Sequence, residues 1–203
     1  MAEFSNPANY TDDNIRTLEG LEHIRLRPGM YIGRLGNGNN PGDGIYVLLK
    51  EVVDNTIDEF SMGFGKQVLI DIADSQVSVR DFGRGIPLGS VVSATSKLNT
   101  GAKFDDKSFK KSVGLNGVGT KAVNALSEKF YVCSYRDGEC SWARYERGKL
   151  LDSGREPSSE KNGTLVRFTP DAEMFTGFAY NMETPFTFWE MLAARKLMEN
   201  FSL

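Results

Sequence analysis

The chain of 203 residues carries 24 lysine and arginine residues against 27 acidic ones, and 40% of its residues are hydrophobic. This length and composition fit one globular domain with its own core. The small acidic excess disfavours a domain that grips DNA phosphates with a basic surface. Because the N-terminus is neither basic nor apolar, no signal peptide or membrane segment is expected, and we predict a cytoplasmic protein.

The N-terminal region divides into an arm, a helix and a loop. Residues 1–13 are polar and are predicted to form an arm without a core of its own, ahead of one domain at 14–203. A helix over about residues 15–26 is expected to end at Arg27-Pro28-Gly29, because proline disfavours the helical conformation in the residue before it. A loop rich in glycine and asparagine follows at 37–43.

The pattern of residues 44–63 predicts a helix with two contrasting faces. Glu51, Asn55 and Asp58 gather on one side, with Glu51 and Asn55 one turn apart. A carboxylate and a carboxamide at this spacing can hold a hydrated Mg²⁺ ion together with a water molecule, because magnesium prefers oxygen ligands and keeps several waters. The alternative is an ordinary solvated face. The opposite side carries an apolar stripe made of Tyr46, Leu49, Val53, Ile57 and Phe60.

A predicted β-hairpin at 67–72 and 76–81 leads into a first glycine-rich segment, Asp81-Phe82-Gly83-Arg84-Gly85-Ile86-Pro87. Val77 and Val79 alternate with polar residues, so a period of two places Asp81 on the apolar face. A carboxylate that points inward needs hydrogen-bond partners. The amino group of a flat ligand could supply one, and the glycines would let that ligand approach the backbone. A tight turn with Asp81 rotated towards water is the alternative.

A second glycine-rich segment, Gly114-Leu115-Asn116-Gly117-Val118-Gly119, follows a lid-like stretch at 83–113 and precedes a predicted helix. A glycine loop that enters a helix N-terminus offers unpaired N–H groups to an anion. It is not a P-loop, because Gly119 is followed by Thr120 and Lys121 instead of lysine and then serine or threonine. A flexible surface loop is the alternative.

The remainder of the chain is predicted to be mostly β-structure. Strands are expected at about 129–135, 140–147, 149–152 and 163–168, and a last helix at about 184–198. Strands outnumber crossover helices, which predicts an α+β fold, a two-layer α/β sandwich whose mostly antiparallel mixed sheet carries helices on one face. Cys133 and Cys140 flank a hairpin turn, and a two-residue turn would set them opposite Trp142 and Tyr135. Both are predicted to be reduced.

Taken in order, Glu51-x-x-x-Asn55, Asp81-x-Gly83-x-Gly85-Ile86-Pro87 and Gly114-x-x-Gly117-x-Gly119 resemble the split-ATPase (GHKL) superfamily. That superfamily contains type II DNA topoisomerases, heat-shock chaperones, mismatch-repair ATPases and sensor histidine kinases. Four further segments are similar to the ATPase domain in the B subunits of bacterial DNA gyrase and topoisomerase IV, namely 27–33, 100–106, 123–127 and 163–168. The resemblance runs from about Tyr10 to Leu203 and implies a Bergerat-type ATP-binding fold.

The resemblance implies a role for each motif. Glu51 would be the general base for the water that attacks the γ-phosphate, and Asn55 would coordinate Mg²⁺. Asp81, supported by Thr164, would accept a hydrogen bond from the adenine amino group. The remaining implied ATP contacts are the adenine-pocket residues Gly83, Arg84, Gly85, Ile86 and Pro87, the phosphate ligands Lys103, Gly114, Leu115, Asn116, Gly117, Val118 and Gly119, and Tyr10, which would reach the nucleotide of a second copy of the chain.

The resemblance also implies partners outside this sequence. The protein would form an ATP-dependent homodimer, and it would meet DNA and a topoisomerase A-type subunit through other regions. A lysine from a following domain would complete the site, so this chain alone is expected to be mainly monomeric and to bind ATP but hydrolyse it weakly. The short lid and Leu115-Asn116-Gly117 slightly favour topoisomerase IV over gyrase. Phe82 departs from the family, which usually has a second acidic residue there.

Two other classes stay open at this stage. A histidine-kinase or chaperone ATPase would share the three motifs, but would not be expected to carry the segment 27–33. A non-catalytic ATP sensor would need no water-activating base at Glu51.

Overall fold

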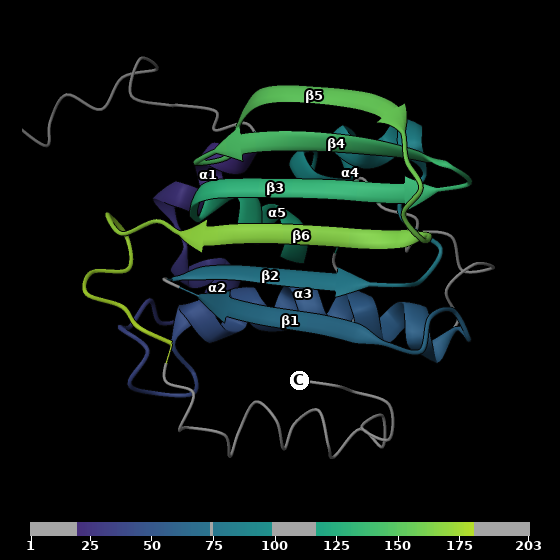
Figure 1. Cartoon of the computed structure of the whole chain (residues 1–203). Coiled ribbons are helices and arrows are strands. Elements are labelled where there is room, and N and C mark those ends of the chain that lie inside the picture. Colours follow the sequence, from purple (N-terminus) through teal and green to yellow (C-terminus); the bar gives the residue numbers. More distant parts are fainter. Residues whose placement is uncertain (1–19, 74, 99–116, 181–203) are drawn as a thin grey trace, which may run out of the picture.

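The computed structural model describes residues 20–73, 75–98 and 117–180, and these form one six-stranded sheet with helices packed on one face (Figure 1). The predictions for the arm, for Tyr10, for Lys103, for 114–116 and for the last helix lie outside the described residues.

The strands lie in the order β1-β2-β6-β3-β4-β5, and each neighbouring pair that the structure describes is antiparallel. Three pairs are hairpins between consecutive strands, whereas β6 returns from the end of the described chain to lie between β2 and β3. This confirms the α+β sandwich. The strands are β1 (Val68–Ala73), β2 (Gln76–Asp81), β3 (Ser127–Arg136), β4 (Glu139–Glu146), β5 (Lys149–Pro157) and β6 (Gly163–Pro170).

The predicted end of β5 was wrong, because this strand continues to Pro157 instead of ending near residue 152. Most of its residues are exposed and none is buried, since β5 lies at the edge of the sheet. An edge strand without a buried face shows no apolar alternation, so its length could not be read from the pattern.

The helices of the described chain lie behind the sheet in Figure 1. Two of them, α2 and α4, were not predicted. α2 follows Pro28, a residue that suits the start of a helix, and α4 lies within the stretch that was expected to be lid-like. None of the helices in the described ranges is long and apolar enough to cross a membrane. The helical elements are α1 (Leu21–Leu26), α2 (Gly29–Ile32), α3 (Gly44–Ser61), η2 (Leu88–Ser90), α4 (Val91–Ser96) and α5 (Gly119–Ala125).

The core lies between the helices and one face of the sheet. Phe130 and Tyr145 of adjacent strands meet edge to face with ring centroids 5.8 Å apart. Of the stripe predicted on α3, Tyr46 and Phe60 are only half-buried. The face is wider than that stripe because α5 packs beside α3 as well as the sheet beneath it. The buried apolar residues of α3 are Ile45, Leu48, Leu49, Val52, Val53 and Ile57.

The other face of the sheet carries a small second cluster. Cys133 lies opposite Trp142 and Cys140 lies opposite Tyr135, which confirms the predicted register. Both cysteines are free thiols. Burial raises the pKa of the Cys140 thiol to about 11, and the neighbouring Cys133 contributes to this rise. The Cys140 thiol therefore stays protonated at neutral pH. Leu165 and Tyr131 complete the cluster.

Candidate functional site

The polar residues of α3 face the start of α5 instead of open solvent. Asn55 Nδ2 donates to Thr120 Oγ1 at 3.0 Å and to the Glu51 carbonyl at 2.9 Å. The Glu51 carboxylate lies so close to Gly119 that a Cβ atom on this glycine would overlap it. The carboxylate and the carboxamide therefore lie beside Gly119 and Thr120, where the second glycine-rich segment enters α5.

One member of the predicted polar side of α3 is closed to solvent. Asp58 is only 2% exposed, which contradicts the alternative of an ordinary solvated face at this residue. It follows Asn55 by only three residues, and α3 as a whole packs against both α5 and β2.

The start of α5 has features that local sequence reasoning did not assign. Gly117 adopts a positive φ of 59°, and α5 begins two residues later at Gly119. Lys121, which is 3% exposed, donates from Nζ to the Gly117 carbonyl. Thr120 binds Asn55 through its hydroxyl. The glycine loop that precedes both residues was the available signal, but no spacing rule identifies their partners.

Asp81 points inward, as the alternation of its strand predicted, and is 8% exposed. Its Oδ1 accepts from the backbone N–H of Gly83 at 2.9 Å and of Thr164 at 3.2 Å. Thr164 thus supports Asp81 through its backbone. Burial raises the pKa of Asp81 above its ordinary value, although both backbone hydrogen bonds and the charge of Arg80 act in the opposite direction.

The first glycine-rich segment is held against α3 and β3. The Arg84 guanidinium forms a two-point ion pair with Glu59, at 2.9 Å from Nη2 to Oε1 and 3.2 Å from Nε to Oε2. Gly85 has a φ of 75°, and a Cβ there would lie 2.8 Å from Ser134 Oγ. Ser134 in turn donates to the Ile86 carbonyl at 2.6 Å. Glycine is needed where the segment approaches β3 this closely.

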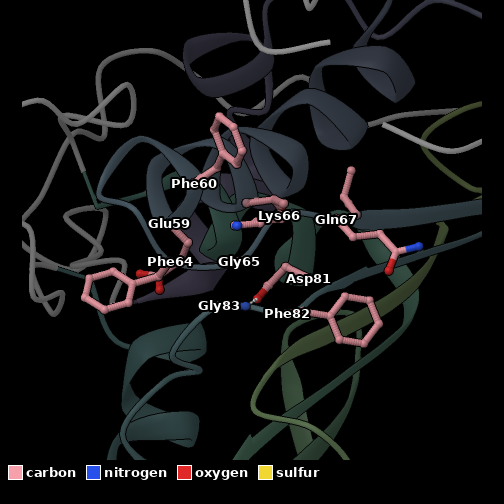
Figure 2. A pocket seen from close by; sticks show the side chains of 11 residues that line it. Glu59, Phe60, Phe64, Gly65, Lys66, Gln67, Asp81, Phe82 and Gly83 are labelled. Atoms are coloured by element: carbon pink, nitrogen blue, oxygen red, sulfur yellow. Dashed lines mark hydrogen bonds between the residues drawn. The ribbon is translucent and has the colours of Figure 1, made fainter. Parts of the chain in front are cut away.

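A small cavity of about 20 Å³ lies beside Asp81 and Gly83, between β2 and the C-terminal end of α3 (Figure 2). Glu59 and Phe60 of α3 contribute to its wall. A cavity of this volume holds about one water molecule and is too small for a nucleobase. It can supply a solvent bridge beside the Asp81 carboxylate, but it is not the ligand pocket itself.

Three side chains of α3 connect the two parts of the site. Glu51, Asn55 and Glu59 are four residues apart and therefore lie along one side of the helix. The first two meet the start of α5, and Glu59 meets Gly83 and Arg84. Glu51 and Glu59 are separated by about 12 Å of helix rise. A ligand that touched both ends would need an elongated shape, with hydrogen-bond donors at the Asp81 end.

The other predicted site residues fall into two groups. Val118 immediately precedes α5, and Pro87 immediately precedes η2. Their ligand contacts stay predictions. The residues Tyr10, Lys103, Gly114, Leu115 and Asn116 lie outside the described residues.

Asn55 also meets the chemical requirement for magnesium. It uses Nδ2 for both hydrogen bonds given above, and the oxygen of its carboxamide is the type of ligand that Mg²⁺ prefers. The Glu51 carboxylate lies one turn away on the same side of α3. Since magnesium keeps several waters, one or two protein oxygens are enough.

Comparisons with known proteins identify the family of the chain. The sequence profile of the histidine kinase-, DNA gyrase B-, and HSP90-like ATPase family matches residues 40–174. The chain is 57% identical over 173 residues to the B subunit of DNA topoisomerase 4 from Borreliella burgdorferi, an alignment that covers 85% of this chain and 29% of that protein. It is 39% identical over 198 residues to the B subunit of DNA gyrase from Treponema denticola, covering 93% of this chain and 29% of that protein.

A solved structure shows the same fold. The crystal structure of the 43K ATPase domain of Thermus thermophilus gyrase B, in complex with an aminocoumarin, matches with a TM-score of 0.69 at 29% identity. The match covers 89% of this chain and 45% of that one. The chain spans less than a third of the length of the two curated relatives. Since the family profile covers more than half of the sequence, the chain belongs to the histidine kinase-, DNA gyrase B-, and HSP90-like ATPase family.

Proposed function

We propose that this chain is the ATP-binding and ATP-hydrolysing part of the B subunit of a cytoplasmic bacterial type II DNA topoisomerase. The observation that carries the proposal is the contact of Glu51 and Asn55 with the start of α5, with Asp81 buried at the other end of the same site. The 57% identity to a B subunit of topoisomerase 4, against 39% to a B subunit of gyrase, favours topoisomerase IV.

The phosphate end of the site supplies positioning and a base. Glu51 orients the attacking water and accepts its proton, because its carboxylate lies against Gly119 at the start of α5. Backbone N–H groups of the second glycine-rich segment hold the phosphates. Magnesium, when bound through Asn55, neutralises charge on the triphosphate. Phosphoryl transfer depends mainly on such positioning and charge stabilisation, so a single well-placed carboxylate is sufficient.

The base end of the site recognises adenine. The Asp81 carboxylate accepts from the exocyclic amino group, while the Gly83 and Thr164 N–H groups hold the carboxylate in place. A hydrogen bond to a charged acceptor is about twice as strong as one between neutral groups. The buried position excludes competing water and strengthens this selection.

The ATP site is coupled to assembly of the protein. Residues 1–13 are polar, which predicts an arm with little to bury against in its own domain, 14–203. In the proposed mechanism, the arm crosses to a second copy when ATP binds, and Tyr10 reaches the nucleotide of that copy. DNA and the A-type subunit contact regions outside this sequence, and closure of the dimer links ATP turnover to DNA strand passage.

Two substitutions in a longer form of the protein test the assignment. Glu51→Ala should keep nucleotide affinity within a few-fold and reduce turnover by about 100-fold or more, the range for loss of a general base. Asp81→Asn should weaken binding by about 1–3 kcal/mol in calorimetry. Glu22→Ala, which removes an exposed glutamate of α1, is the matched control and should change neither quantity.

The outcomes separate the competing functions. If Glu51→Ala turns ATP over at nearly the normal rate, Glu51 is only a polar residue of α3 and the catalytic assignment fails. If the unsubstituted protein binds ATP but shows no magnesium-dependent hydrolysis, the site is an ATP sensor. Unchanged affinity in folded Asp81→Asn would remove Asp81 from adenine recognition.

A further inference from the structure

Arg80 occupies an unusual position beside the base end of the site. It is 9% exposed and lies on the opposite face of the sheet from Asp81, because neighbouring residues of β2 alternate in direction. Its guanidinium carbon lies 4.6 Å from the ring centroid of Phe82 and 4.6 Å from that of Tyr135. Both distances fall within the range of cation–π contacts.

The hydrogen bonds of Arg80 join two segments that are far apart in the sequence. Nη1 donates to the Asp81 carbonyl at the end of β2. Nη2 donates to the Lys161 carbonyl, just before β6, at 2.5 Å. Gly163 adopts a φ of 136°, and a Cβ atom there would overlap the Asp81 carbonyl and the Arg80 guanidinium. A glycine is therefore required where the two segments meet.

The junction between the end of β2 and the start of β6 also fixes the position of the Asp81 carboxylate. Thr164, whose N–H donates to Asp81 Oδ1, directly follows Gly163. Separation of the β6 start from the β2 end would lengthen that 3.2 Å hydrogen bond. The rings of Phe82 and Tyr135 limit the movement of the guanidinium that ties these ends together.

We propose that Arg80, held by Phe82 and Tyr135, is a positioning residue for adenine recognition, because it ties β2 to β6 and keeps the Asp81 acceptor aligned. This inference rests on the proposed binding of adenine by Asp81. It also gives Phe82 a function, since a second acidic residue there could not form the ring contact with Arg80.

Arg80 has an electrostatic effect as well as a geometric one. Burial raises the pKa of Asp81, and the charge of Arg80 opposes this rise, whereas Glu59 adds to it. Glu59 is paired with Arg84, and Lys66 lines the small cavity beside Asp81. Without the guanidinium, Asp81 would become protonated at a higher pH and lose its charged acceptor there.

The test compares four substitutions in the full-length protein, with a non-hydrolysable ATP analogue as the probe. Arg80→Met keeps an unbranched stem but removes the guanidinium, and with it the donors, the charge and the contacts with both rings. We expect the Kd for the analogue and the KM for ATP to rise about 5- to 30-fold, less than for a directly lost hydrogen bond to a charged group because Arg80 acts through Asp81, while kcat changes little. The pH below which affinity is lost should move upwards.

Arg80→Lys and Phe82→Leu separate the two effects. Lysine restores the charge but not the fork of donors, so the pH profile should return towards normal while affinity recovers only in part. Phe82→Leu removes one ring contact and should weaken binding in the same direction, by less than Arg80→Met. Arg144→Met is the matched control, because Arg144 also lies over an aromatic ring, that of Trp142 at 5.4 Å, but pairs with Asp152.

The results distinguish this inference from the function on which it rests. A folded Arg80→Met protein with normal Kd, KM and pH profile would overturn the positioning role, even if its melting temperature fell. If Arg80→Met does not fold, a normal Kd and pH profile in Arg80→Lys together with a normal Kd in Phe82→Leu would overturn it. Unchanged affinity in Asp81→Asn would instead contradict the proposed adenine contact.

Discussion

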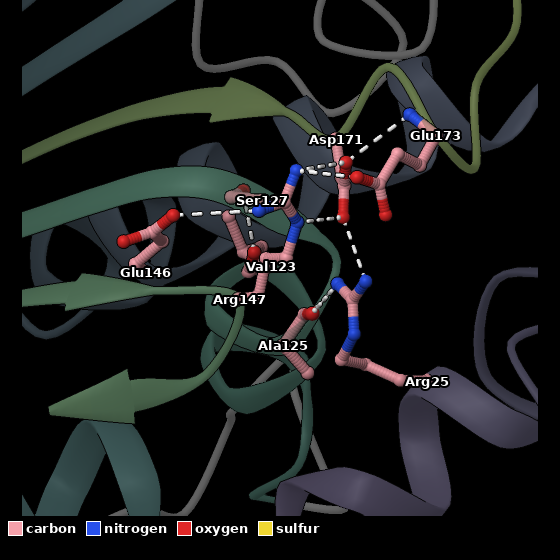
Figure 3. Close-up of polar contacts among 8 residues, drawn as sticks. All are labelled: Arg25, Val123, Ala125, Ser127, Glu146, Arg147, Asp171 and Glu173. Carbon is pink, nitrogen blue, oxygen red and sulfur yellow. Dashed lines mark hydrogen bonds and ion pairs between the residues drawn. The ribbon is translucent and has the colours of Figure 1, made fainter.

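Asp171 is predicted to be a main contributor to the stability of the described fold. Its side chain is 0% exposed and follows β6 directly. It accepts from Arg25 Nη2 of α1 at 2.7 Å, from Arg147 Nε of the β4–β5 turn at 2.9 Å, and from the Glu173 N–H at 3.1 Å (Figure 3). Arg25 also donates to the carbonyl of Ala125, the last residue of α5, at 2.8 Å. One carboxylate thus connects three parts of the structure.

The substitution Asp171→Asn removes the charge while it keeps the shape. The carboxamide then turns one N–H₂ group towards arginines that have only donors. A hydrogen bond between charged groups contributes about 1.5–3 kcal/mol. The Arg25 contact is buried on the Asp171 side, so we expect the free energy of unfolding to fall by about 1.5–3 kcal/mol. The contacts of the more exposed Arg147 are left out of this figure because solvent screens them.

Urea unfolding of the 203-residue chain, followed by circular dichroism, measures the effect. With a denaturant slope of about 2 kcal/mol per molar, the midpoint should fall by about 1 M at pH 7. Glu173→Gln is the matched control, because Glu173 also binds Arg147, at 3.0 Å, but is 71% exposed. Its midpoint should not change. An Asp171→Asn midpoint equal to that of the unsubstituted chain would refute the reasoning.

The effect should also depend on pH. Burial raises the pKa of Asp171, but the hydrogen bonds from Arg147 and Arg25 outweigh it and hold the pKa below the ordinary value of 3.8. A group whose pKa is lower in the folded state binds its proton more weakly there, so folding is favoured when the group is ionised. The stabilisation is fully present above pH 3.8 and is lost as the pH falls through the folded-state pKa. The difference in unfolding free energy between Asp171→Asn and the unsubstituted chain should therefore become smaller at acidic pH.

Three further predictions concern the site, the core and assembly. Gly119→Ala should displace the Glu51 carboxylate and lower turnover in the longer protein more than it lowers nucleotide affinity, and equal losses in kcat and affinity would contradict this. Tyr145→Phe should cost about 1 kcal/mol in urea unfolding, because the Tyr145 hydroxyl lies 3.0 Å from Thr95 Oγ1 inside the core, and an unchanged midpoint would argue against that bond. Deletion of residues 1–13 should abolish the dimerisation of the longer protein that a non-hydrolysable ATP analogue drives, while the monomer still binds the analogue. Sedimentation that shows full dimerisation without these residues would rule out a role of the arm in dimer formation.

Local periodicity was sufficient for several features. The helical period placed Glu51 and Asn55 on one side of α3, and the strand period turned Asp81 inward. The register of β3 and β4 followed from a two-residue turn at Asp137 and Gly138, both of which have positive φ. Each of these depends on residues within a few positions of one another, so the sequence was enough.

The periodicity of the sequence did not predict burial correctly where a helix or strand packs against more than one neighbouring element. Asp58 is buried and Tyr46 is only half-buried, although a single-helix pattern predicts the reverse, because α5 and the sheet cover α3 from two directions. The predicted length of β5 was wrong because an edge strand without a buried face shows no alternation of apolar and polar residues. Burial is a property of the packed layers and not of one segment.

The sequence by itself determined the motifs, the inward side of β2 and the family. Only the tertiary structure decided which distant residues meet. The insertion of β6 between β2 and β3 brings Thr164 to Asp81, and the packing of α5 on α3 brings Gly119 to Glu51. The Arg80 contact with Tyr135 likewise needs this strand order, because it joins β2 to β3 across β6. Such contacts are chosen by how whole layers pack and by which buried polar groups find partners, and no local pattern encodes either.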